Sequence, residues 1–268
     1  MRVGGMAFGN GVFMRGPNYW AWAREDGTVV DAPVHTLLKR HRWLRAPVLR
    51  SIVTLAEMFA LTFALHRRNG ALRGARLLFW LAMCVAADFC FSLALPYLIR
   101  DPRPQQVVLG VLDFAFGLLA LRYGLGKDIW RYHGAEHKAV NAYEGGADLA
   151  DVRVAMTYSR VHDRCGTNLA VLSILLLLLG YPLVSNLALG ELGDMLYAAL
   201  IIVLSLEFFR LIAKRPGSRL SRALLAGGKA LQRGVTTREP APEHVRLACV
   251  ALSRVIELED RPPGAASF

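Results

Sequence analysis

Three side chains capable of metal binding or proton transfer stand close together at residues 133–137. His133, Glu136 and His137 are spaced i, i+3 and i+4, so on a helix all three face the same direction. Two imidazoles at this spacing can bind one metal ion, and the carboxylate beside them can act as a further ligand or as a proton acceptor. The alternative interpretation is a solvated turn of a charged helix, but the grouping of these residue types favours a site.

The same residues read in order as His-x-x-Glu-His, the arrangement found in inverted zinc peptidases. Glu136 is then the expected general base. Glu144 lies three helical turns after His133 on the same face, where a further carboxylate could contribute a ligand. The cofactor that these ligand types favour is Zn²⁺ or another divalent transition metal.

A second polar cluster precedes the next apolar segment and adds an imidazole, a thiol and a guanidinium. His162 and Cys165 are spaced i and i+3, and both are potential zinc ligands. Arg164, beside Cys165, is expected to lower the pKa of the thiol and to favour the thiolate. In the alternative interpretation this segment only caps the following helix, with Thr167 and Asn168 as the capping residues.

The number of ligands decides which chemistry the two clusters can perform. The four nitrogen and sulfur candidates are His133, His137, His162 and Cys165. If all four bind, the site is closed and structural, whereas three ligands leave a position for water and make hydrolysis possible. A developing oxyanion would then need hydrogen-bond donors, for which the candidates are Asn168, Arg164 and Lys138.

The composition points to a membrane protein. In this chain of 268 residues 54% are hydrophobic, the mean hydropathy is +0.34, and the apolar residues come in blocks long enough to cross a bilayer. No short N-terminal apolar run with a small-residue cleavage site occurs, so secretion through a cleaved signal is not expected. The net charge of +11 fits cytoplasmic loops that face anionic lipid head groups, and we expect no nucleic-acid partner.

Four apolar segments have the length of transmembrane helices. They are residues 77–99, 107–125, 169–189 and 196–213. Residues 48–65 contain Arg50 and Glu57 and have basic flanks, which is typical of an interfacial or re-entrant helix. Glycines that alternate with apolar residues at the start of the chain predict a short strand and turn. The expected fold is an all-α polytopic membrane protein with a small N-terminal strand and turn region.

The charge distribution predicts where each region lies relative to the membrane. Six Lys and Arg residues occur at 126–168 and ten from residue 214 onward, whereas the link at 190–194 has none. Both termini and the metal-site segment are therefore expected on the cytoplasmic side of the cell membrane. The expected regions are a Gly- and Arg-rich cytosolic region at 1–47, a membrane domain at 48–213 containing the polar cytosolic loop 126–168, a basic helical region at 214–256 and a disordered tail at 257–268.

Several longer motifs, in order along the chain, resemble those of the YqhQ-like bacterial membrane proteins, a domain family of unknown function. They are GGMA at 4–7, NGV at 10–12, MRGP at 14–17, YHGAEHK at 132–138, His162 with RCGTN at 164–168, and Gln232 with TTREP at 236–240. The resemblance implies a cytoplasmic-membrane protein described as a metal-dependent enzyme. Asp163 stands where proline is expected, and Phe208 departs from the tyrosine-glutamate pairing expected near Glu207; neither is a proposed ligand.

The leading hypothesis is a zinc-dependent hydrolase that acts on a membrane-associated substrate. One alternative is a non-catalytic scaffold, in which the metal locks the central segment to the tail and the basic surface recruits a partner. A second is a transporter that uses Asp88 and Glu207, although Arg210 is close enough in sequence to pair with Glu207. A di-iron lipid oxidase could use the same histidine spacing but needs many more histidines than the seven present.

Overall fold

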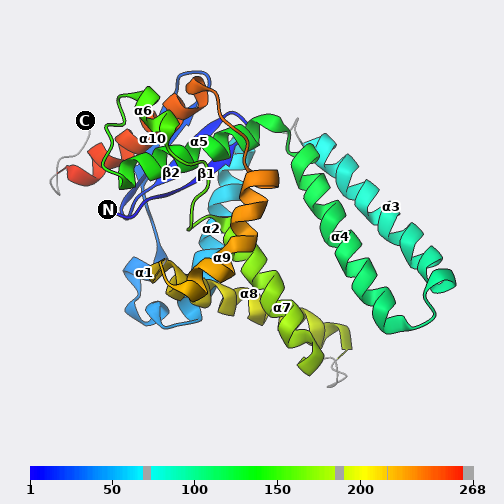
Figure 1. The fold of residues 1–268 in the computed structure, drawn as a ribbon. Helices are drawn as coiled ribbons and strands as arrows, with labels where there is room; N and C mark the ends of the chain where they lie inside the picture. The colour runs from blue at the N-terminus through cyan, green and yellow to red at the C-terminus, as the bar shows by residue number, and fades with distance from the viewer. Residues whose placement is uncertain (69–73, 185–189, 216, 262–268) are drawn as a thin grey trace.

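The computed structural model describes residues 1–68, 74–184, 190–215 and 217–261 and is mostly helical (Figure 1). A small antiparallel sheet comes first, two helical hairpins follow, and the C-terminal helices return to the sheet. The helical elements are α1 (Leu37–Arg40), the 3-10 helix η1 (Arg42–Arg45), α2 (Leu49–Arg68), α3 (Gly74–Leu98), α4 (Pro102–Gly124), α5 (Lys127–Glu144), α6 (Val152–Thr157), α7 (Gly166–Val184), α8 (Gly190–Lys214), α9 (Arg219–Leu231), the π-helix η4 (Gln232–Thr236) and α10 (Pro242–Asp260).

The sheet is a meander of four antiparallel strands in the order β1-β2-β3-β4. The strands are β1 (Gly4–Phe8), β2 (Gly11–Arg15), β3 (Tyr19–Arg24) and β4 (Val29–Pro33). Gly27, with a φ of +82°, supplies the left-handed conformation in the turn between β3 and β4. We expected only a short strand and turn here. Strands of five or six residues gain their stability from pairing and packing, so the local sequence did not reveal the four-stranded sheet.

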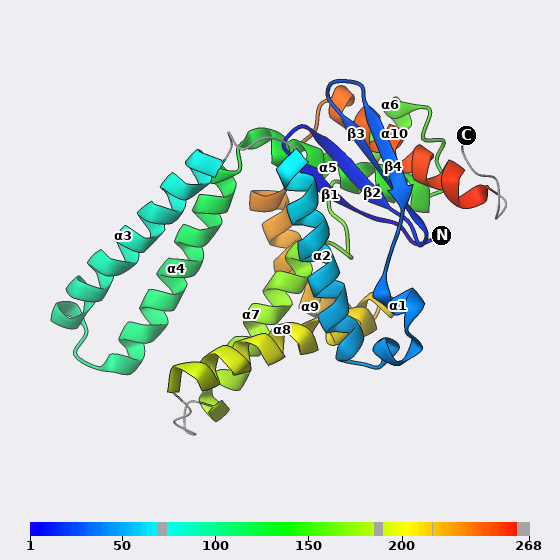
Figure 2. The ribbon, with the colours of Figure 1, turned by 180° about the vertical axis from the view of Figure 1, so that it is seen from behind.

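Alternate residues of the strands bury the two faces of the sheet in separate cores. On one face, the strand residues Val12, Met14, Ala21 and Ala23 share a core with Tyr132 of α5 and Val255 of α10. On the other face, aromatic residues meet Leu65 near the end of α2: Phe8, Phe13 and Trp22. Figure 2 shows α2 rising toward the sheet on the side away from α10. Both α2 and α5 thus reach the edge strand β1 from different sides.

Two described segments are long and apolar enough to cross a membrane, Leu78–Leu98 in α3 and Leu192–Lys214 in α8. A third candidate is the pair Val108–Gly124 and Lys127–Glu144, which meet at a 91° bend. The apolar helix Gly166–Gly180 within α7 is shorter than the others. The structure therefore contains two or three candidate spans where about four were expected. The last part of the expected span 169–189, residues 185–189, lies outside the described residues.

The helices form two hairpins that extend away from the sheet. α3 packs on α4 and α7 packs on α8, and in both views the first hairpin stands apart from the second (Figures 1 and 2). Within the second group α8 also contacts α2, where Arg50 and Arg210 both bind Glu207. The expected pairing of Glu207 with Arg210 is confirmed at 2.6 Å between Oε1 and a guanidinium nitrogen.

The expectation that residues 126–168 form a polar, solvated loop was wrong. The first part of this segment is the 18-residue helix α5, the short α6 follows, and α5 is buried between β1 and α10. Its buried face consists of small and apolar residues at helical spacing: Ala135, Ala139, Val140 and Ala142. Charged residues lie between these positions, so the overall polarity of the segment hides the helical pattern of its apolar residues.

The C-terminal helix is longer than the sequence indicated. α10 continues to Asp260, four residues past the end expected for the helical region, and Glu259 accepts hydrogen bonds from the backbone of Asn18 and Tyr19. These contacts hold the end of α10 against the start of β3, so the helix has packing partners that its own sequence does not reveal. Residues 262–268 of the expected tail lie outside the described residues.

Candidate metal centre

The helix α5 places His133, Glu136 and His137 on one face, as their spacing requires. Two glycines allow other segments to approach this helix closely. A Cβ at Gly5 of β1 would lie 2.7 Å from Cγ of Glu136, and a Cβ at Gly134 would lie 2.3 Å from the carbonyl oxygen of Arg238. The backbone of β1 and the segment after η4 are therefore pressed against the face of α5 that carries the two histidines.

Three possible metal ligands converge at this face. Nitrogen or sulfur atoms of His133, His137 and Cys165 all lie within 4.8 Å of one another. The Sγ atom of Cys165 is 3.3 Å from Nε2 of His133. A tetrahedral zinc ion with bonds of about 2.0–2.3 Å separates its ligand atoms by roughly 3.3–3.8 Å. This group could hold a metal ion, and the separation of Cys165 and His133 lies within this range.

Backbone carbonyls hold both imidazoles in the orientation that a metal site needs. Nδ1 of His133 lies 2.6 Å from the carbonyl oxygen of Thr236, and Nδ1 of His137 lies 2.7 Å from that of Arg160. A carbonyl oxygen only accepts, so each Nδ1 carries the hydrogen and donates it. Each Nε2 then presents its lone pair to the shared centre, the arrangement typical of histidines that bind metals.

Glu136 points at the same centre. One of its carboxylate oxygens is 3.9 Å from Nε2 of His133 and 3.8 Å from Nε2 of His137. The residue is only 6% exposed, and burial raises the pKa of its carboxyl to about 8. A carboxyl group beside the ligand atoms, rather than among them, is in position to exchange a proton with a water molecule at the centre.

Burial dominates the electrostatics of the three possible ligands. It lowers the pKa of His133 and, together with the neighbouring histidines, lowers that of His137 well below its usual value, so both imidazoles are neutral. It also raises the pKa of the Cys165 thiol to about 11. We expected Arg164 to stabilise the thiolate; instead Arg164 pairs with Glu144, and the nearest donor to Sγ is the backbone N–H of Thr167 at 3.4 Å.

His162 and Glu144, two of the predicted ligands, form a separate pair. Nε2 of His162 lies 3.4 Å from a carboxylate oxygen of Glu144, which also binds Arg164. Burial raises the pKa of the Glu144 carboxyl, but the hydrogen bond and charge of Arg164, reinforced by His162, outweigh it and leave that pKa below its usual value. The structure thus brings three of the four nitrogen and sulfur candidates together and gives His162 another partner.

The predicted oxyanion donors are divided in the same way. Arg164 lines the cavity that contains the three ligands. Asn168 is fully buried, and its Nδ2 donates to the carbonyls of His162 and Asp163, so it holds the turn before α7. Lys138 donates to two backbone carbonyls near the end of α6 and pairs with Glu239. Of these three residues, only Arg164 lies along the cavity.

Gln232 is a central contact of the site, although its position in the sequence indicated no role. Its side chain is 0% exposed, accepts a hydrogen bond from the backbone N–H of His162 at 2.9 Å and donates to the carbonyl of the same residue at 3.2 Å. Arg160 adds contacts to the carbonyl and hydroxyl of Thr237. The motif that contains Gln232 was recognisable, but its role depends on contacts about seventy positions apart.

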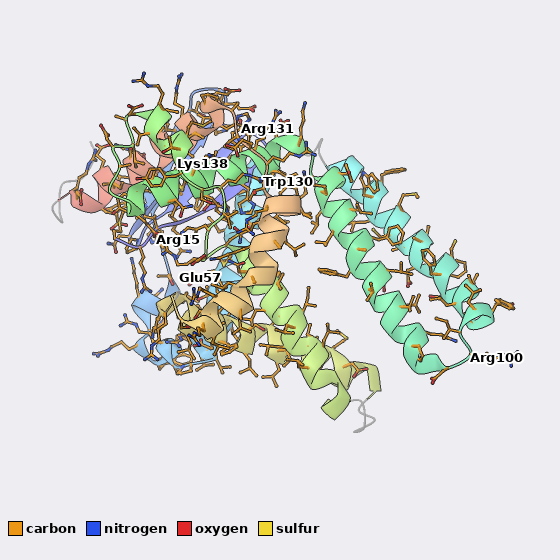
Figure 3. All side chains as sticks on the ribbon, viewed as in Figure 1. Arg15, Glu57, Arg100, Trp130, Arg131 and Lys138 are labelled. Atoms are coloured by element: carbon orange, nitrogen blue, oxygen red, sulfur yellow. The ribbon has the colours of Figure 1, made fainter. Side chains whose placement is uncertain are left out.

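A cavity of about 560 Å³ opens beside the centre. It lies between β1, α2, α5, the start of α7 and the end of α8, and His133, Glu136, His137 and Cys165 form part of its wall. Figure 3 places Trp130 and Lys138 along α5, whereas Arg100 lies at the far end of the α3–α4 hairpin. The candidate centre therefore lies where the sheet meets the helices, far from that tip.

Comparison with known proteins agrees with the motifs. The sequence profile of the family DUF1385, described as a protein of unknown function, matches residues 46–258. The chain is 27% identical to the uncharacterized protein YqhQ of Bacillus subtilis (strain 168) over 299 aligned positions, which cover 96% of this chain and 92% of that protein. No solved structure matches.

Proposed function

This chain belongs to the DUF1385 family of proteins of unknown function, and we propose that it is a zinc-dependent hydrolase that acts on a membrane-associated substrate. One observation carries the proposal: His133, His137 and Cys165 converge while His162 pairs with Glu144. Three ligands and a neighbouring carboxylate leave room for a water molecule, whereas a fourth ligand would close the site. The geometry therefore supports the open alternative of the two that the sequence allowed.

The residues present suit zinc as the cofactor. Two neutral imidazoles, oriented through Nδ1, and one cysteine sulfur form a donor set that zinc accepts readily. When bound, zinc acts as a Lewis acid and lowers the pKa of water to about 7. The protein supplies the fixed orientation of the ligands, a site largely shielded from solvent, and the groups that handle the proton.

Glu136 is the proposed general base. Burial raises the pKa of its carboxyl to about 8, and the positive charge of a metal ion held beside it would lower that pKa and favour the carboxylate that can accept a proton. Its carboxylate oxygen lies beside both Nε2 atoms without displacing them, and the close approach of Gly5 fixes its position. It would accept the proton of the attacking water and deliver it to the leaving group. Arg164 would donate hydrogen bonds to the developing oxyanion from the cavity wall. Asn168 would contribute indirectly, by holding the turn that carries Cys165.

We propose a multi-pass location in the cell membrane, with the sheet and the metal centre on the cytoplasmic side. Both hairpins extend away from the sheet (Figure 1), and α3 and α8 contain the two helical segments that can span a bilayer. The Lys and Arg residues at 126–168 and after residue 214 would then face anionic head groups. In this arrangement α2 is the interfacial helix, and α4 and α7 complete the membrane domain.

Replacement of Glu136 by Gln in the zinc-loaded, detergent-solubilised protein tests the proposal. Fluorogenic lipid analogues with an ester, an amide or a phosphodiester bond serve as probes. The Glu136→Gln protein is expected to retain zinc and to lose activity by about 10²-fold or more. The exposed Glu243→Gln on α10 is the matched control and should behave as the wild type. The proposal would be contradicted if Glu136→Gln hydrolysed a probe as fast as the wild type, or if no protein, including the wild type, hydrolysed any probe.

The non-catalytic scaffold has one observation in its favour. Thr236 and Gln232 tie the histidine helix and the turn of His162 to the C-terminal segment, so a metal ion could serve to lock these parts together. In that case Glu136→Gln would leave the cellular phenotype unchanged, and loss of zinc would loosen the C-terminal region.

The transporter hypothesis gains no such support. Glu207 is occupied by Arg50, Arg210 and Ser51. Asp88 belongs to the separate α3–α4 hairpin, so the two acids do not share one bundle interior within the described part of the chain.

A further inference from the structure

The cavity beside the metal centre extends to a second charged group that takes no part in the proposed chemistry. Arg210, near the end of α8, lines the same cavity as His133 and Cys165. Its guanidinium donates to the hydroxyls of Ser51 at 2.7 Å and Thr54 at 3.2 Å, so the group is held in a fixed orientation by α2. The lining of the cavity thus includes both the metal ligands and an anchored arginine.

The charges around Arg210 do not balance. Arg50 and Arg210 share the single carboxylate of Glu207, and two guanidinium groups with one carboxylate leave one net positive charge. Within the described residues no second carboxylate contacts either arginine. The other arginine of the cavity, Arg164, is neutralised by Glu144. The surplus charge is therefore shared by Arg50 and Arg210, of which Arg210 lines the cavity between α2 and α8.

Between these two polar regions the cavity wall is apolar. The side chains that form it come from the sheet edge and from the helices near the membrane: Met6, Phe8, Met58, Leu169, Leu206 and Phe209. Leu206 and Phe209 belong to the last turns of the candidate span of α8. Its volume of about 560 Å³ lies within the range of about 300–1,000 Å³ usual for ligand pockets.

We infer that this cavity binds an anionic amphiphile, a lipid whose apolar chain lies along Met58 and Phe209 and whose negatively charged group pairs with Arg210. Arg210 shares its carboxylate with Arg50, so an anionic ligand group would balance the remaining positive charge of the pair. The apolar part of the lining favours a ligand with an apolar chain, and the arginine favours an anionic lipid over a neutral one. The inference rests on the proposed function, because it names the substrate class of the same site.

Binding is measured with a fluorescent phosphatidylglycerol in neutral detergent micelles, with phosphatidylcholine as competitor. Neutral detergent micelles are used in place of anionic vesicles, because a protein with a net charge of +11 would bind to an anionic surface without using the cavity. The wild type is expected to prefer phosphatidylglycerol by about tenfold or more, the size of one charge-assisted hydrogen bond. Arg210→Gln should abolish this preference and Arg210→Lys should retain most of it, whereas the exposed Arg219→Gln on α9 should leave it intact.

A second variant leaves the ion pairs of Arg50, Arg210 and Glu207 unchanged. Met58→Trp narrows the cavity between α2 and β1, and it should weaken binding of both lipids while Arg210 keeps its partners. Inorganic phosphate tests whether the site binds a free anion in place of a lipid. It should not displace the lipid if the apolar lining of the cavity contributes to binding. Equal affinity for both lipids, or unchanged binding in both Arg210→Gln and Met58→Trp, would overturn the inference.

The two proposals can fail separately. Charge-selective lipid binding with no hydrolysis by any variant would refute the hydrolase and leave the lipid site intact. Hydrolysis that depends on Glu136, with equal rates on neutral and anionic lipids and no effect of Arg210→Gln, would refute the lipid selectivity alone.

Discussion

Nδ1 of His133 donates a hydrogen bond to the backbone carbonyl of Thr236 at 2.6 Å, across 103 positions of the chain. Thr236 ends the π-helix η4, a conformation that is rare and occurs frequently at functional sites. The C-terminal segment therefore fixes the tautomer of a possible metal ligand. An intact connection between α9 and α10 is part of the candidate metal centre.

The first prediction concerns the set of zinc ligands. Separate replacement of His133, His137 and Cys165 by alanine should each abolish stoichiometric zinc binding, because each removes one of three converging atoms. His162→Ala should retain zinc, since His162 pairs with Glu144. Metal analysis of the purified proteins measures this directly, and loss of zinc in His162→Ala alone would contradict the ligand set.

The second prediction concerns Gln232. Gln232→Leu keeps a similar volume but leaves the buried backbone N–H of His162 without its acceptor, which should cost about 1–3 kcal/mol of stability. The carbonyl of His162 loses one donor but keeps the hydrogen bond from Asn168. Because the turn of His162 leads directly to Cys165, we also expect zinc affinity to fall by about 10- to 100-fold. Thermal unfolding and zinc titration measure the two effects. The neighbouring Arg233→Gln, whose side chain is exposed, is the control.

The third prediction uses two adjacent glycines of β1. A Cβ at Gly5 would lie 2.7 Å from Cγ of Glu136, whereas a Cβ at Gly4 would meet nothing within 4 Å. Gly5→Ala should displace the carboxylate and lower the rate of hydrolysis by about tenfold or more while zinc remains bound. Gly4→Ala should have the activity of the wild type. Similar rates in all three proteins would show that the position of Glu136 is not critical.

The fourth prediction is a pH dependence from Glu144. Its pKa in the folded protein is below the usual value of 4.5, mainly through Arg164. The unfolded chain therefore takes up the proton first as the pH falls, so the stabilisation is complete above pH 4.5 and is lost as the pH falls through the folded pKa. Melting temperatures measured from about pH 6 to about pH 3 should show a smaller acid-induced loss in Glu144→Gln than in the wild type.

Periodicity and residue type already indicated much of the local structure. The apolar runs that became α3 and α8 were recognised because a span is a local property of about twenty consecutive residues. The pairing of Glu207 with Arg210 followed from helical spacing alone. The four-stranded sheet was only partly foreseen, and the burial of α5 was missed, because both depend on partners distant in the chain.

For the candidate site, the sequence by itself determined that His133, Glu136 and His137 face one direction, since the helical repeat links neighbours three and four positions apart. Only the tertiary structure decided that Cys165 joins them while His162 turns to Glu144, and that Asn168 supports the turn instead of facing the cavity. The physical reason is that these choices depend on hydrogen bonds accepted by Gln232, Arg160 and Thr236, whose positions are set by the packing of distant helices.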